Sequence, residues 1–157
     1  MRRAPQRGRG FTLIELLVVM VIIGVTLGLV SLNAIPSQQQ SLRNEAERIA
    51  LLLQLARDEA IVRNRQIAFE AEPDRYRFLV RNEKQWQVVT QDDLLREREF
   101  KHGPVLLSVD PASGAPGPAL RITFGREPVD KPFVLTMAHG DSSVAIRADG
   151  IGHFVAE

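Results

Sequence analysis

The chain has 157 residues, which is enough for one globular domain in addition to an apolar N-terminal segment. It carries 20 basic and 19 acidic residues, and the resulting net charge of +1 gives no indication of a nucleic-acid partner. Cysteine is absent, which excludes thiol catalysis, disulfide bonds and most structural zinc sites, and fits either a reducing cytosol or an oxidising periplasm.

The N-terminus combines a basic leader with a long apolar segment. Residues 1–10 contain four arginines and no acid, and without them the chain has 16 basic and 19 acidic residues. In residues 11–35 the only charged side chain is Glu15. As a helix this segment would be about 37 Å long, which exceeds the roughly 30 Å of a bilayer core. We therefore expect a transmembrane helix at 11–35, with the arginine-rich end in the cytoplasm and the remainder outside.

Two simpler interpretations of this segment are weaker. A cleaved secretory signal would have an apolar core of about 7 to 15 residues and a small-x-small cleavage site, whereas this run is longer and ends in residues 33–36, Asn-Ala-Ile-Pro. A plain membrane anchor explains everything except Glu15. A carboxylate inside a membrane costs about 2.5 to 3.5 kcal/mol at the centre and less near an end, and it is usually functional, so Glu15 should have a partner.

The stretch Gly10-Phe11-Thr12-Leu13-Ile14-Glu15, after a basic leader, resembles the class III signal of type IV pilins and type II secretion pseudopilins. The resemblance implies that a prepilin peptidase cleaves after Gly10 and methylates Phe11. It also implies that Glu15 forms an assembly salt bridge with the N-terminal amine of a neighbouring subunit. Two opposite charges in an apolar bundle each lack water, so each favours the position that supplies the other.

An amphipathic helix should continue the apolar segment over residues 36–66, after an interruption at Pro36. Small and apolar side chains recur at alternating steps of four and three, at Leu42, Ala46, Ile49, Leu53, Ala56 and Ala60. A coiled-coil seam is the alternative, but the stripe has only about three heptads and is half alanine. A helix packed on a sheet explains the pattern better.

From residue 67 the hydrophobic pattern changes to a period of two, which indicates short antiparallel strands. We expect strands at 67–71, 76–80, 86–89, 105–109, 120–124, 133–137, 144–148 and 153–155. The Gly- and Pro-rich segment 110–118 should be a mobile loop. The predicted fold is therefore α+β, with a long N-terminal helix, half transmembrane and half amphipathic, packed on a β-sheet or β-sandwich head at residues 67–157.

Two further stretches resemble the minor pseudopilin H family, which shares features with some minor type IV pilins. They are residues 57–66, RDEAIVRNRQ, and residues 144–154, VAIRADGIGHF. The calcium-binding loop and Tyr-Pro-rich segment typical of the major pseudopilin are not found in the sequence. The resemblance implies a subunit at or near the tip of the periplasmic pseudopilus, which exports folded proteins through the outer membrane.

The same resemblance implies a location and a set of partners. The chain would span the inner membrane once, with its C-terminal domain in the periplasm. The partners would be the other minor pseudopilins, the major pseudopilin, the prepilin peptidase and the inner-membrane assembly platform, with secreted exoproteins as further candidates.

No pattern in the sequence indicates catalysis, a metal site or a cofactor. The histidines lack metal-ligand spacing and the serines lack a nucleophile elbow. The acids of 70–74 and 92–93 do not match an EF-hand loop and should be solvated. These candidates are His102, His139, His153, Ser108, Ser113, Ser142, Ser143, Asp92, Asp93, Glu70, Glu72 and Asp74. A membrane-tethered enzyme stays open only if the fold gathers some of them.

A minor type IV pilin that binds DNA or another surface ligand is the competing function. Arg75, Arg77 and Arg81 share one face of a predicted strand, and some minor pilins bind DNA through such stripes. Acidic residues interleave with these arginines, so a mixed, solvated surface is the better interpretation and nucleic acid is not an expected partner. Trp86, the only tryptophan, is expected in the core.

Overall fold

The computed structural model describes residues 12–32, 37–101, 103–112 and 119–157, with residues 27–32 described by their backbone only. The chain divides into two compact units, Met1–Pro36 and Ser37–Glu157. We refer to the second unit as the head. The uncertain part of the expected loop at 110–118, residues 113–118, lies outside the described residues.

The N-terminal unit contains helix α1 (Leu13–Leu32). No helix in the described part of the chain is long and apolar enough to cross a membrane. The segment expected from the sequence to span the membrane, residues 11–35, extends beyond the described residues at both ends.

Helix α2 (Gln38–Val62) begins the head with a cap of its own. The side-chain oxygen of Ser37 accepts a hydrogen bond of 3.1 Å from the backbone amide of Gln40, which satisfies one of the free donors at the helix start. The helix ends before Asn64, which has a φ of +52°. Every member of the stripe expected at residues 42–60 is buried, which confirms the predicted periodicity.

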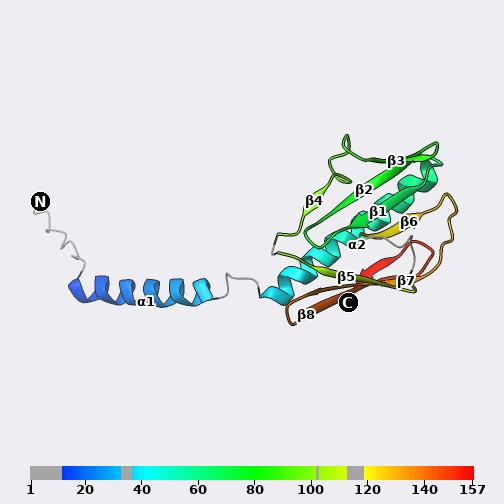
Figure 1. The fold of residues 1–157 in the computed structure, drawn as a ribbon. Helices are drawn as coiled ribbons and strands as arrows, with labels where there is room; N and C mark the ends of the chain where they lie inside the picture. The colour runs from blue at the N-terminus through cyan, green and yellow to red at the C-terminus, as the bar shows by residue number, and fades with distance from the viewer. Residues whose placement is uncertain (1–11, 33–36, 102, 113–118) are drawn as a thin grey trace, which may run out of the picture. The chain divides into compact units, whose positions relative to one another are not determined.

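Two antiparallel sheets complete the head, and α2 packs between them (Figure 1). The first sheet has the order β3 (Gln85–Val88), β2 (Arg75–Asn82), β1 (Ile67–Ala71) and β6 (Leu120–Phe124), and β4 (Arg98–Glu99) also pairs with β2. The second has the order β5 (Leu106–Asp110), β7 (Phe133–His139), β8 (Ser142–Ala148) and β9 (Phe154–Ala156). Each expected strand overlaps one of these, and among the described residues only the two-residue β4 is new.

The core lies where α2 meets both sheets. From the first sheet, Phe69 packs against Phe78 with ring centroids 5.5 Å apart and against Tyr76 at 5.8 Å. From the second sheet, Leu135 and Ile146 are fully buried. A helix packed on antiparallel sheets confirms the predicted α+β class.

The first sheet differs from the prediction on its outer face, the face opposite α2. Strict alternation would expose Ala68 and Glu70, but Ala68 is 0% and Glu70 4% exposed. β1 lies between β2 and β6, so long side chains from both neighbours cover it on this face. The expectation that Trp86 is a core residue is also wrong. Trp86 is half-buried on the outer face, with the Cζ atom of Arg81 5.6 Å from its ring centroid.

Candidate functional site

Of the three residues that the sequence assigned to processing and assembly, the structure describes only Glu15, because Gly10 and Phe11 lie outside the described residues. Glu15 is exposed in the first turn of α1. Its backbone amide donates to Thr12 Oγ1 at 3.3 Å and to the Thr12 carbonyl at 3.1 Å. Thr12 therefore caps the helix.

The sequence contains a signal for this cap, although the prediction of a helix at 11–35 does not depend on it. Thr12 and Glu15 have the T-x-x-E spacing of a capping box, in which a hydroxyl bonds to an amide three residues later. The spacing places the Glu15 carboxylate at the positive end of the helix dipole, where negative charge is favoured. The position of Glu15 thus has a local reason in addition to any role in assembly.

Apart from Glu15, α1 exposes apolar side chains on all its sides over the residues whose side chains are described, Leu13 to Thr26. The large apolar residues from Leu13 to Val25 are between 42% and 82% exposed in the single chain. The hydroxyl of Thr26 donates to the carbonyls of Ile22 at 2.8 Å and Ile23 at 3.0 Å, so it is satisfied within the helix. A helix that is apolar all round is suited to burial among other apolar groups.

A buried carboxylate lies at the centre of the outer face of the first sheet. The Oε1 atom of Glu70 accepts from Arg77 Nε at 2.8 Å and Nη2 at 2.6 Å, and its Oε2 accepts from Arg121 Nε at 2.9 Å and also from Arg121 Nη2. Burial by itself would raise the pKa of Glu70, but the hydrogen bonds from Arg121 and Arg77 outweigh it and hold this pKa below its ordinary value. The expectation that Glu70 is a solvated acid is wrong.

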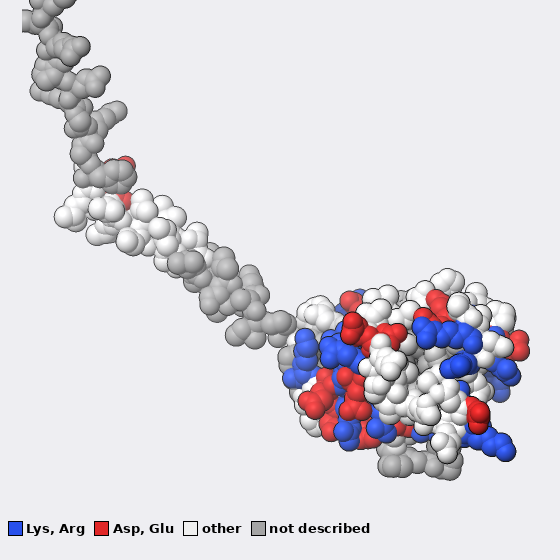
Figure 2. All heavy atoms as spheres, turned by 90° about the horizontal axis from the view of Figure 1, so that it is seen from above, with Lys and Arg blue, Asp and Glu red and all other residues white. Residues whose placement is uncertain are grey.

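The stripe of arginines expected on β2, which comprises Arg75, Arg77 and Arg81, lies on a surface of mixed charge. Arg75 donates to Glu72 at 3.1 Å, and Arg77 forms an ion pair with Glu70. Figure 2 shows basic and acidic side chains interspersed over one face of the head. Two members of the stripe are therefore neutralised, which confirms the interpretation of this surface as mixed.

The two stretches that carry the resemblance to the minor pseudopilin H family meet in the head. Arg57, in α2, is 9% exposed, and its Nη2 atom donates to the carbonyl of Pro128. Gly152 has a φ of +118°, and a β-carbon there would lie 2.6 Å from Arg57 Nη1. Only a residue without a side chain fits this approach without displacing the guanidinium.

The turn that contains Gly152 is organised by Asp149. Its Oδ1 atom accepts from the backbone amides of Ile151 at 2.8 Å, Gly152 at 3.1 Å and His153 at 3.0 Å. Its Oδ2 atom lies 2.6 Å from His153 Nδ1. These contacts show why the stretch ADGIGH is suited to a tight connection between β8 and β9, and they give His153 a structural role.

Two further candidates for chemistry have local structural partners, whereas His102 and Ser113 lie outside the described residues. His139 Nδ1 lies 2.7 Å from the Pro104 carbonyl. Asp92 accepts from the amides of Leu94 and Leu95 at 2.8 and 3.1 Å. In the part of the chain that the structure describes, no three His, Cys, Asp or Glu residues are grouped so that they could hold a metal ion.

Comparison with known families gives two matches. Residues 45–152 match the family model described as type II transport protein GspH. Residues 6–31 match the prokaryotic N-terminal methylation motif. The first match includes most of α2 and nearly all of the strands, and the second includes the stretch from Gly10 to Glu15.

Individual relatives agree with these matches. The chain is 45% identical over 87 residues to type II secretion system protein H of Pseudomonas aeruginosa, an alignment that covers 54% of the chain and 51% of the relative. The chain thus aligns with about half the length of this relative. Two solved structures of the minor pseudopilin EpsH of Vibrio cholerae have the same fold at 19% identity. Their TM-scores are 0.57 and 0.59, and the alignments cover 74% and 77% of this chain and 96% and 98% of theirs.

Proposed function

Because the chain belongs to the GspH family of type II transport proteins, we propose that it is a minor pseudopilin of a type II secretion system. It assembles at or near the tip of the periplasmic pseudopilus that exports folded proteins across the outer membrane. The observation that carries this proposal is the match of the GspH family over residues 45–152, together with the methylation motif over residues 6–31.

The proposal assigns a role to each part of the chain. Residues 1–10 are a leader that the prepilin peptidase removes after Gly10, and Phe11 becomes the methylated N-terminus. Residues 11–35 anchor the protein in the inner membrane, residues 36–66 continue the helix, and residues 67–157 form the rest of the periplasmic head. The N-terminal motif and the apolar sequence after it support this division.

Assembly then depends on α1. Apolar helices from several subunits bundle together, and Glu15 pairs with the amine of Phe11 in a neighbouring subunit. Two features support this step, namely the apolar surface on all sides of α1 and the exposed carboxylate at its capped start. Because both charges are removed from water, the axial register that pairs them is favoured, and registers that leave either charge unpaired are costly.

The head acts through its surfaces and performs no reaction. Its neighbours are the other minor pseudopilins and the major pseudopilin. A cytoplasmic ATPase supplies the force through the assembly platform. Secreted proteins are a further class of partner for the exposed surfaces of the head. No nucleic acid is required for this role.

Complementation and crosslinking in the source cells test the proposal. Deletion of the gene should abolish export of type II substrates, and the full chain should restore it. Because the chain has no cysteine, a single Leu51→Cys variant places one thiol on an exposed site of α2 for crosslinking to other pseudopilins. Normal export together with a loss of DNA uptake in the deletion strain would instead indicate a minor type IV pilin.

A further inference from the structure

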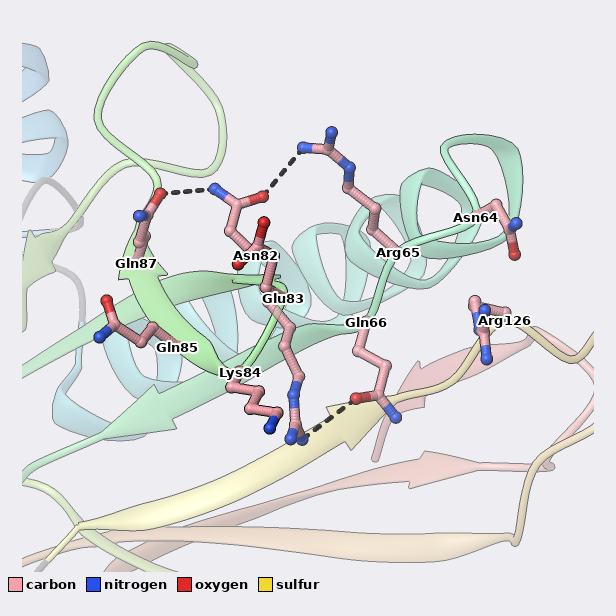
Figure 3. Close-up of a pocket in the computed structure, with 10 residues that line it drawn as sticks. Asn64, Arg65, Gln66, Asn82, Glu83, Lys84, Gln85, Gln87 and Arg126 are labelled. Carbon is pink, nitrogen blue, oxygen red and sulfur yellow. Dashed lines mark hydrogen bonds between the residues drawn. The ribbon is translucent and has the colours of Figure 1, made fainter.

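A wide polar hollow lies at the end of the head where α2 finishes (Figure 3). Its volume is about 1020 Å³. Its walls come from residues 64–66 between α2 and β1, from the adjoining ends of β2 and β3 with the turn between them, and from Arg126 just after β6. The 25 residues of α2 span about 37 Å, so the hollow is far from Ser37, where the chain enters the head.

Positive charge is concentrated in this hollow. Its charged lining residues are one acid, Glu83, and four bases, Arg65, Arg81, Lys84 and Arg126. Within the part of the chain that the structure describes, none of these four bases forms an ion pair, whereas Arg75, Arg77 and Arg121 on the outer face all do. The head as a whole has 16 basic and 18 acidic residues, so this local excess is opposite in sign to the net charge of the head.

Neutral amides hold two of these cations in place. Arg65 Nη1 donates to Asn82 Oδ1 at 3.1 Å, and Arg81 Nη1 donates to Gln66 Oε1 at 3.3 Å, both drawn as dashed lines in Figure 3. An amide oxygen orients a guanidinium without cancelling its charge. Each guanidinium has five N–H donors, so most of its donors are still available to a ligand.

We propose that this hollow binds an acidic polypeptide segment of another protein. Arginine side chains bind carboxylates with two parallel hydrogen bonds, and side-chain amides can both donate to and accept from a peptide backbone. The described residues that line the hollow include no aromatic ring for base stacking, and the nearby Trp86 ring lies beside the guanidinium of Arg81, 5.6 Å from its Cζ atom. The acidic net charge of the head also disfavours a polyanion that extends beyond the hollow.

Binding of a labelled peptide to the full chain in neutral detergent tests this site. The probe is a fluorescein-labelled peptide of alternating glutamate and serine, and its control replaces every glutamate with glutamine. The hollow variant combines Arg65→Gln, Lys84→Gln and Arg126→Gln. The matched variant, which removes the same charge from exposed bases elsewhere, combines Arg96→Gln, Lys101→Gln and Lys131→Gln.

The glutamate peptide should bind at low salt and the glutamine peptide should not. The hollow variant should weaken binding about tenfold and the matched variant less than about twofold, because exposed charge pairs are individually weak but sum within one site. Both comparisons use the same N-terminal residues, so the leader arginines cannot account for a difference. A single Lys84→Gln variant should also weaken binding, which keeps the test valid if the triple variant misfolds.

Three results would overturn the proposal. Equal losses in the hollow and matched variants would show that only the total charge of the protein matters. Tighter binding of duplex DNA than of the peptide, lost in the hollow variant, would assign the site to nucleic acid. Sedimentation that shows self-association through the hollow would assign it to a second copy of the chain.

Discussion

The Nη1 atom of Arg57 in α2 lies 2.6 Å from the point that a β-carbon on Gly152 would occupy. The side chain of one motif thus fills the space left by the missing side chain of the other, although the two are far apart in the sequence. Hydrogen bonds from Arg57 to the Pro128 carbonyl and from the turn amides to Asp149 hold both sides of this contact.

Gly152→Ala should lower the free energy of unfolding by about 1 to 3 kcal/mol. The new methyl group would strain a backbone with a φ of +118° and displace the guanidinium of Arg57. Urea denaturation of the full chain, followed by circular dichroism, measures the change. Gly125→Ala is the control, because its β-carbon would meet nothing nearer than 3.8 Å and its φ is not in the positive range. Equal losses in the two variants would contradict the packing role of Gly152.

Glu70→Gln should destabilise the head, because it leaves Arg77 and Arg121 without their shared carboxylate. Removing one partner of a buried pair costs about 3 to 5 kcal/mol, and we expect the lower end or less because the two arginines are about one-third exposed. Chemical denaturation at neutral pH measures the loss. Glu97→Gln is the control, since Glu97 approaches the same group of arginines but is 42% exposed.

The contacts of Glu70 with Arg77 and Arg121 also make the stability of the head depend on pH. The pKa of Glu70 is lower in the folded state than its ordinary value of 4.5, so its stabilising effect is present above that pH. The effect is lost as the pH falls through the folded pKa, because the carboxylate must then be protonated. Denaturation midpoints measured from neutral to acid pH should therefore fall less steeply in Glu70→Gln than in the wild type. Parallel curves for the two proteins would contradict the lowered pKa.

Tyr76 should titrate at high pH. Burial, followed by the nearby Glu45 carboxylate, raises the pKa of Tyr76 to about 12 from an ordinary value of 10.0. The protonated phenol is thus favoured by folding, so its contribution to stability is complete below pH 10 and is lost as the pH rises through about 12. Tyr76 is the only tyrosine, so tyrosinate absorbance in the full chain reports on it alone. A midpoint near 10 in the folded protein would contradict its buried position.

Gly10→Ala should block processing. The larger precursor should stay in the membrane fraction and retain residues 1–10, as a gel shift and intact mass would show. Gly8→Ala, which leaves Gly10 and Phe11 unchanged, should be cleaved normally. If the native protein in functioning cells keeps the leader, the assignment of the cleavage site is wrong.

Variants of Glu15 can separate its two roles. Glu15→Ala and Glu15→Val should be cleaved normally but should assemble poorly, as measured by crosslinking and export. Glu15→Gln keeps the backbone amide that Thr12 caps but carries no charge, so it should also assemble poorly if the salt bridge is required. Thr26→Val is the control, because the Thr26 hydroxyl bonds only within its own helix in the described structure. Normal export with Glu15→Gln would contradict the salt bridge as the role of Glu15.

Local patterns in the sequence were sufficient to predict most of the helices and strands. The buried stripe of α2 and the alternation in β2 and β8 depend on neighbours a few residues apart, so periodicity alone located them. The two-residue β4 is too short to produce a period, and it forms because β2 offers a partner at Arg75 and Tyr76.

The predictions that were wrong concern residues whose surroundings depend on contacts between strands. Glu70 is buried because Arg77 and Arg121 reach it from both sides, and this depends on a register that the sequence does not reveal. The hollow has the same cause, since Arg126 joins Arg65 and Lys84 only in the folded head. The cap at Thr12, in contrast, is encoded locally by the T-x-x-E spacing and was predictable from the sequence.

The separate cap on α2 has a consequence for engineering and for evolution. Ser37, which belongs to the head, caps the start of α2. The start of this helix therefore does not depend on hydrogen bonds from the chain before Ser37. Anchors of different length or origin should be exchangeable upstream of Ser37 while the head keeps its structure. A modular junction of this kind would let one family fit the same head to membranes of different thickness.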